Sequence, residues 1–101
     1  MNSFEKTAQF DDWLRSLKDR TGRLRIFARL TSAQHGNFGD CLPVGSGVFE
    51  MRIHYGPGYR VYFTRRDKTV YLLLIGGDKS SQKRDIRQAI DMAATIGKEQ
   101  S

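Results

Sequence analysis

The second half of this chain is divided by glycines into four short runs that are rich in β-branched and aromatic residues. The runs cover residues 41–44, 48–54, 59–66 and 69–76, and the segments between them are short, with GPG at 56–58 and RRDK at 65–68. Such residues favour strands, and short connections join neighbouring strands in antiparallel order. The pattern therefore restricts this region to four strands of an antiparallel sheet.

Helical signals flank this region on both sides. Apolar residues between positions 10 and 17 recur at spacings of three and four, which predicts an amphipathic helix that follows the N-cap residue Thr7 and ends near residue 18. A second helix is predicted from about residue 21 to residue 34, with Gly36 as its stop. A last helix is capped by Ser80 or Ser81 and reaches about residue 96.

Residues 3–6 are expected to add a short first strand, so the predicted order is β-α-α-β-β-β-β-α. This order predicts an α+β fold in which an N-terminal helical hairpin and a C-terminal helix pack on a twisted antiparallel sheet of four to five strands. Alternation along the third run places Val61 and Phe63 on one face and Arg60 and Tyr62 on the other. Tyr59 is expected to point towards the helices.

The composition fits one small basic domain covering residues 1–101. The chain has 17 Lys and Arg against 11 Asp and Glu, a net charge of +6, which favours a polyanionic partner such as RNA or DNA. One cysteine and two distant histidines predict no metal and no cofactor. No apolar run is long enough for a membrane span and no leader is visible at the N-terminus, so a cytoplasmic location and no membrane contact are expected.

Several segments resemble one known family. They read TAQFDDWLRSLKD from residue 7, FGD from 38, GSGVFEMRI from 45, GPGYRVYF from 56 and LLLIGGDKSSQKRDI from 72. Together these segments resemble the RelE/ParE superfamily of toxins, specifically the addiction-module killer proteins related to HigB. The resemblance covers nearly the whole chain.

The resemblance implies a toxin of a type II toxin–antitoxin system with a RelE-like fold, in which a sheet face or edge receives RNA in the ribosomal A site. Members of the RelE branch cleave messenger RNA on the ribosome, and their partner is a small antitoxin, here expected to be of the helix-turn-helix type. Members of the ParE branch instead inhibit DNA gyrase, and the fold alone does not choose between these activities. A third interpretation is a basic nucleic-acid-binding module without toxicity.

Cleavage of RNA without a metal requires groups that remove a proton, stabilise charge on the phosphate and protonate the leaving oxygen. Arginine suits the second task, because its planar guanidinium holds two phosphate oxygens and stays charged. Arg60 stands where the GYR motif of the family has its phosphate-binding arginine, so the resemblance makes it the first candidate.

Three further residues complete the candidate catalytic set. Arg52 shares a strand face with Glu50 and His54, and a hairpin that turns at GPG brings this face opposite Arg60. His54 is a candidate acid or base near neutral pH. Lys79 follows the last strand, where the family commonly presents another cation. We expect Arg52, Arg60 and Lys79 to converge on one phosphodiester.

Other residues are expected to bind RNA rather than to react with it. Tyr62 is a candidate stacking platform, and Lys83 is expected to contact RNA from the last helix. The family's tyrosine early in that helix is missing, and Asp85 falls near its place. A second basic cluster in the second helix is expected either to face solvent or to contact ribosomal RNA; it consists of Arg23, Arg25 and Arg29.

Overall fold

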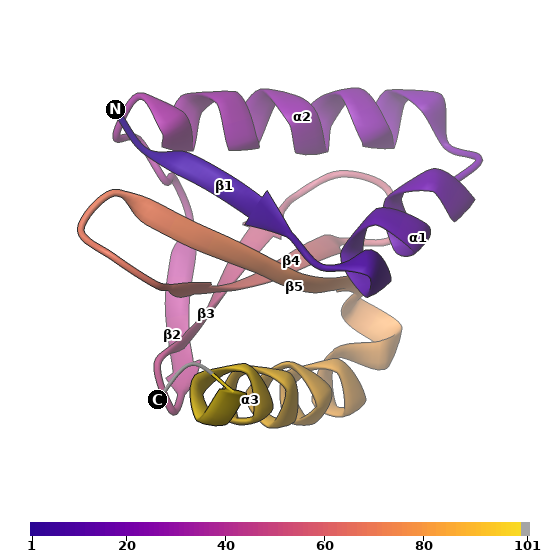
Figure 1. The fold of residues 1–101 in the computed structure, drawn as a ribbon. Helices are drawn as coiled ribbons and strands as arrows, with labels where there is room; N and C mark the ends of the chain where they lie inside the picture. Colours follow the sequence, from indigo (N-terminus) through magenta and orange to yellow (C-terminus); the bar gives the residue numbers. More distant parts are fainter. Residues whose placement is uncertain (100–101) are drawn as a thin grey trace.

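The computed structural model describes residues 1–99 and has the predicted α+β class (Figure 1). Its elements follow one another as β1 Ser3–Lys6, α1 Ala8–Ser16, α2 Arg20–Gln34, β2 Cys41–Gly45, β3 Val48–Ile53, β4 Tyr59–Arg65, β5 Val70–Asp78, a 3-10 turn Lys79–Ser81 and α3 Gln82–Glu99. The order of helices and strands is the predicted one, with the 3-10 turn added before α3.

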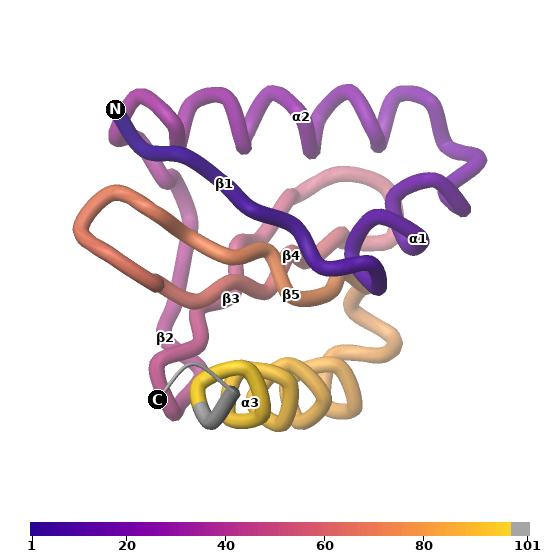
Figure 2. Tube along the Cα trace, in the orientation of Figure 1, coloured from indigo at the N-terminus to yellow at the C-terminus, as the bar shows by residue number. Residues whose placement is uncertain are grey.

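The five strands form one sheet in the order β1-β5-β4-β3-β2. Strands β2 to β5 are antiparallel, as predicted from their short connections. Strand β1 is parallel to β5, with Ser3 opposite Val70, so the prediction of an antiparallel sheet was wrong for this strand. Short connections carry no information about β1, because two helices and three strands separate it from its partner. Figure 2 shows the first residues beside the end of α2, where the Asn2 N–H donates to the Gln34 carbonyl.

The helices cover both faces of this sheet, with α1 and α2 on one side and α3 on the other (Figure 1). Helix α1 packs on β5, whereas α2 packs on β3. The two N-terminal helices are consecutive, as expected of a hairpin, but each packs mainly on the sheet rather than along the other. None of the helices in the described part of the chain is long and apolar enough to cross a membrane.

Side-chain caps explain where the helices begin. The Thr7 hydroxyl accepts a hydrogen bond from the Phe10 N–H, so the predicted N-cap of α1 is confirmed. The carboxylate of Asp19 caps α2, and it also accepts a hydrogen bond from the Tyr59 hydroxyl at 2.8 Å. Asp78 caps the 3-10 turn that leads into α3, and the predicted cap residues Ser80 and Ser81 lie within this turn.

The sheet separates two apolar cores. The core below α1 and α2 contains Val61 and Phe63, and the core below α3 contains Tyr62 and Leu74. The predicted alternation along β4 is therefore confirmed, and Tyr59 lies on the α1 and α2 side as expected.

Two glycines in β5 let helices approach the sheet closely from opposite sides. A Cβ on Gly76 would lie 2.1 Å from the Trp13 ring of α1, and a Cβ on Gly77 would lie 1.9 Å from a carboxylate oxygen of Asp85 in α3. Because real Cβ atoms do not approach other atoms this closely, the pair of glycines makes room for the Trp13 ring on one face and for the Asp85 carboxylate on the other.

Candidate nucleic-acid interface

A buried carboxylate, Glu50 of β3, organises the side of the sheet that faces the start of α3. Its oxygens accept hydrogen bonds from Arg52 Nε, from the Tyr62 hydroxyl and from Gln82 Nε2, each at 2.9 Å. The Nε of Arg60 lies 3.9 Å from the same carboxylate. One side chain thus connects β3, β4 and the first residue of α3.

The hydrogen bonds to Glu50 keep this carboxylate charged. Burial raises its pKa, but the hydrogen bonds from Arg52, Gln82 and Tyr62 together outweigh burial and hold the pKa below its usual value. The pKa of Tyr62 is raised, first by burial and then by its hydrogen bond to Glu50. Glu50 is therefore an anchor for donors around it, and its lone pairs are engaged rather than free to accept a proton.

Arg60 lies almost wholly inside the protein, with 7% of the residue exposed. It stands directly opposite Arg52 in the pairing of β3 with β4. Its Nη1 donates to the Gly58 carbonyl at 3.1 Å, while its Nε has no hydrogen-bond partner among the described residues. Because Glu50 is shared by both guanidinium groups, this trio carries one uncompensated positive charge.

Two lysines extend the positive charge towards solvent. Gly58 lies between Arg60 and Lys79: a Cβ at this glycine would be 3.3 Å from Arg60 Nη1 and 3.4 Å from the Cβ of Lys79. The side chain of Lys79 therefore leaves the backbone close to the Arg60 guanidinium. Lys79 and Lys83 are exposed, and residues 79–84 line a depression of about 590 Å³. We call Arg52, Arg60, Lys79 and Lys83 the basic cluster.

Acidic side chains near the basic cluster are already engaged. Hydrogen bonds from the Ser80 hydroxyl and amide lower the pKa of Asp78. Asp85 is 3% exposed, lies against Gly77 and accepts a hydrogen bond from Ser81. It is therefore turned to the sheet, away from a position in which it could meet RNA.

His54 flanks the basic cluster at the end of β3. Its side chain is 68% exposed, and its Nε2 lies 2.5 Å from Oδ2 of Asp40. The pKa of Asp40 is lowered, first by the hydrogen bond with His54 and further by the positive charges of Arg52 and Arg29. Since the backbone N–H of Arg52 donates to the Asp40 carbonyl, the pair of His54 and Asp40 lies beside the strand that carries Arg52.

The structure corrects the expected role of Tyr62. This ring is fully buried below α3, and its hydroxyl is held by Glu50. A buried ring cannot stack on a base, so Tyr62 is a structural residue in this fold. Alternation identified its face of the strand, but not that the last helix covers that face at this position.

The second basic cluster expected from the sequence lies on the opposite side of the sheet and is divided there. The Arg29 guanidinium donates to the carbonyls of Phe38, Asp40 and Arg52 and so ties α2 to the end of β3. The Arg25 guanidinium lies 4.9 Å from the centre of the Tyr55 ring. Arg23 lines a different surface, between α1 and α2. The three arginines therefore have three separate environments.

Two residues at this site were not singled out from the sequence. From the sequence, Glu50 is predicted only to share a strand face with Arg52, and no role is predicted for Gln82. The available signal for Glu50 was a carboxylate inside the run VFEMRI, whose other residues apart from Arg52 are apolar. A charged residue that is buried in such a run needs a partner of opposite charge. Arg52, two positions later on the same face of the strand, is that partner.

This geometry suits the binding of a phosphodiester at the basic cluster. The surface offers two exposed lysines and a half-buried arginine above a buried arginine, and the nearby carboxylates are occupied by other donors. Cations that are preorganised in this way stabilise negative charge on phosphate oxygens.

Comparison with known proteins agrees with a toxin-like scaffold. Residues 12–98 match the family described as phage derived protein Gp49-like (DUF891). A protein of Haemophilus influenzae that carries the name "Uncharacterized protein" is 46% identical over 91 residues, which cover 90% of this chain and 92% of that relative. The chain therefore belongs to the Gp49-like family of phage-derived proteins, a RelE/Gp49 toxin-like family associated with toxin–antitoxin systems.

Proposed function

We propose that this protein is the toxin of a type II toxin–antitoxin system, of the HigB-like branch, and that it arrests translation by cleaving messenger RNA on the ribosome. The observation that supports the proposal is that Arg52 and Arg60 stand opposite each other beside Glu50, while Lys79 begins close to Arg60. Family membership supports the toxin role and is consistent with an antitoxin partner. The endonuclease activity and the ribosome as its place of action are inferences from the resemblance and the basic cluster.

In this proposal the scissile phosphate sits above the two arginines. Arg52 and Lys79 contact its oxygens from the solvent side, and Arg60 adds positive charge from below. Glu50 is a positioning residue, since it fixes the guanidinium of Arg52 by a 2.9 Å hydrogen bond. Preorganised charge of this kind stabilises the phosphorane-like transition state more than the ground state.

The reaction proposed here needs no metal. The 2′-oxygen forms a bond to phosphorus while the bond from phosphorus to the 5′-oxygen breaks, which gives a 2′,3′-cyclic phosphate and a 5′-hydroxyl. A base takes the proton of the 2′-hydroxyl, and an acid supplies a proton to the leaving 5′-oxygen. His54, paired with Asp40 and exposed beside Arg52, is our candidate for one of these transfers.

The first test is expression of the chain in bacterial cells without its antitoxin. We expect growth arrest with transcripts cut within coding regions and bearing 5′-hydroxyl ends. Arg60→Ala is expected to abolish the cuts, and Arg60→Lys to restore part of them, because lysine keeps the charge without the planar fork. The readout is primer extension on an abundant transcript, together with growth curves.

Arg87→Ala is the matched control, since it removes one exposed cation of α3 outside the basic cluster. It should leave cutting unchanged. Growth arrest with intact transcripts and an SOS response would reject the nuclease and favour a gyrase inhibitor of the ParE type. Normal growth, together with salt-dependent binding of free RNA or DNA, would favour a nontoxic nucleic-acid-binding module.

A further inference from the structure

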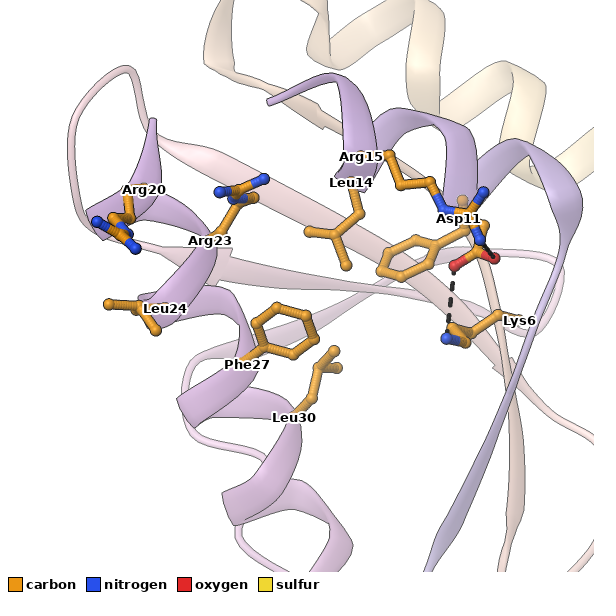
Figure 3. Close-up of a pocket in the computed structure, with 10 residues that line it drawn as sticks. Lys6, Asp11, Leu14, Arg15, Arg20, Arg23, Leu24, Phe27 and Leu30 are labelled. Atoms are coloured by element: carbon orange, nitrogen blue, oxygen red, sulfur yellow. Dashed lines mark hydrogen bonds and ion pairs between the residues drawn. The ribbon is translucent and has the colours of Figure 1, made fainter. Parts of the chain in front are cut away.

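A groove between α1 and α2 lies on the face of the sheet opposite to the basic cluster. It has a volume of about 430 Å³ and is lined by residues of both helices and by Lys6 at the end of β1. In Figure 3, Leu14 of α1 and Phe27 and Leu30 of α2 point into the space between the helices. The groove arises because each helix packs on its own part of the sheet rather than on the other helix.

The wall of this groove formed by α2 is unusually apolar for a surface. Leu24 is 63% exposed and Phe27 is 51% exposed, and they are two of the four large apolar residues that the described chain leaves exposed. Ile26 faces the core and the buried Leu30 lies at the floor of the groove, so Leu24 and Phe27 add exposed apolar surface beside the buried face of α2. Large exposed apolar side chains that gather in a concave surface typically mark an interaction site.

The rim of the groove is positively charged. Arg20 and Arg23 stand at one end, and Lys6 and Arg15 stand at the other (Figure 3). The one acidic residue of the lining, Asp11, already pairs with Lys6 and Arg15, each at 3.4 Å. Within the described residues, the side chains of Arg20 and Arg23 form no ion pair or hydrogen bond. Charge complementarity therefore calls for an occupant with carboxylates at the end beside Arg20.

We propose that this groove binds an acidic amphipathic helix of the antitoxin, with two or three apolar side chains between the helices and Asp or Glu against Arg20 and Arg23. This inference rests on the proposed toxin function, because that function supplies the partner. A helix in an apolar groove is a common mode of protein recognition. An RNA backbone would meet the same arginines, but it would leave Leu24 and Phe27 uncovered.

The groove is also separate from the basic cluster, so the proposed binding of the antitoxin and the proposed cleavage of RNA use different surfaces. The groove is lined by α1, α2 and Lys6, whereas the basic cluster lies across the sheet at the start of α3. A helix of the antitoxin in the groove therefore binds the protein without contacting Arg52 or Lys79. The groove variant Phe27→Asp should therefore remain toxic but no longer be neutralised by the antitoxin, and this combination distinguishes a docking surface from a part of the active site.

The test uses the whole chain and, as the probe, the purified product of the gene that neighbours its own. Phe27→Asp and the pair Arg20→Glu with Arg23→Glu should each raise the dissociation constant at least about 30-fold, as expected for the centre of an interface. Phe27→Asp should still arrest growth when expressed alone. In hydrogen exchange, the probe should protect amides of residues 20–30.

The matched control is the pair Lys68→Glu with Arg87→Glu, which makes the same change of net charge at exposed positions outside the groove. It should bind the probe as the wild type does. Unchanged affinity of the groove variants, or protection confined to residues 79–87, would overturn the inference, as would a failure of every neighbouring gene product to bind. Loss of toxicity with unchanged affinity for the probe would assign the groove to RNA instead.

Failure of the proposed function has a different signature. If the wild-type chain does not arrest growth but binds the neighbouring product in a manner that depends on Phe27, the docking surface stands and the toxin role falls. Thermal unfolding followed by circular dichroism checks that each variant is folded, which is expected because the substituted side chains are not part of the buried core.

Discussion

Glu50 holds its charge at a fully buried position, and donors from two strands and a helix make this possible. A buried carboxylate is costly unless its oxygens are hydrogen-bonded and a cation is close. Arg52 and Arg60 provide the cations, while Tyr62 and Gln82 complete the hydrogen bonds. The same contacts orient the arginines, so stability and the proposed RNA site depend on one side chain.

We therefore expect Glu50→Ala to lower the free energy of unfolding by about 3–5 kcal/mol, because it leaves Arg60 buried without its counter-charge. Urea unfolding followed by Trp13 fluorescence measures this change. Glu5→Ala, which removes an exposed partner of Arg66, is the control and should cost less than about 1 kcal/mol. Equal effects of the two substitutions would contradict the assigned role.

The lowered pKa of Glu50 also predicts how stability depends on pH. A carboxyl group whose pKa is lower in the folded than in the unfolded state stabilises the protein above the unfolded-state pKa, which is about 4.3 for Glu. That stabilisation is lost as the pH falls through the folded-state pKa. Between pH 6 and pH 3, wild type should therefore lose more unfolding free energy than Glu50→Gln. Parallel curves for the two proteins would refute this.

At the scale of single residues, the alternation along β4 predicted which side chains share a face of the sheet, but not which of them a helix covers. It placed Arg60 and Tyr62 on one face and Val61 and Phe63 on the other, as found. It did not reveal that Tyr62 lies below α3, because that depends on where a helix twenty residues later crosses the sheet. The GPG turn predicted that β3 and β4 pair but left open whether Arg52 or His54 stands opposite Arg60, and the register of the two strands selects Arg52.

At the scale of elements, the contact between α1 and β5 depends on the absence of a side chain at position 76. We expect Gly76→Ala to destabilise the protein by about 1–3 kcal/mol, because a Cβ there would overlap the Trp13 ring and push α1 from the sheet. Urea unfolding measures the cost, and a blue or red shift of tryptophan emission reports the displaced ring.

A double-mutant cycle isolates this contact. In a Trp13→Leu background the overlap is gone, so Gly76→Ala should cost less than about 1 kcal/mol there. If the cost is the same in both backgrounds, the effect of the alanine comes from the backbone rather than from α1.

Helix α2 shows why an element can be predicted while its faces are not. Its bounds were predicted to within one residue, yet its apolar and basic residues are spread around the whole helix. The faces were decided by tertiary contacts: Arg29 towards three carbonyls, Arg25 over Tyr55 and Arg23 into the groove. No periodicity in the sequence separates these three roles.

At the scale of the whole molecule, the net charge of +6 predicts that the proposed binding of RNA weakens as salt rises. For single-stranded RNA, each phosphate contact adds about 0.7 to the slope of log K against log salt. Removing Lys79 and Lys83 together, by substitution with alanine, should therefore make this slope shallower by about 1.4. Fluorescence anisotropy with a labelled single-stranded RNA measures the slope.

The control for this experiment is the pair Lys68→Ala and Arg87→Ala, which lowers the net charge equally outside the basic cluster. Its slope should match the wild type. If both pairs shift the slope alike, RNA responds to overall charge rather than to the basic cluster.

The parallel pairing of β1 with β5 has a consequence for the order in which the chain folds during synthesis. Residues 3–6 leave the ribosome well before their partners, residues 70–73, and the Thr7 hydroxyl donates to the Leu74 carbonyl, which lies 67 positions later in the chain. Closing such a long loop is slow, and the edge of β5 that pairs with β1 stays unpaired until the loop has closed. The nascent chain therefore completes its sheet only after residues 70–74 have left the ribosome, so shorter nascent chains lack the pairing of β1 with β5.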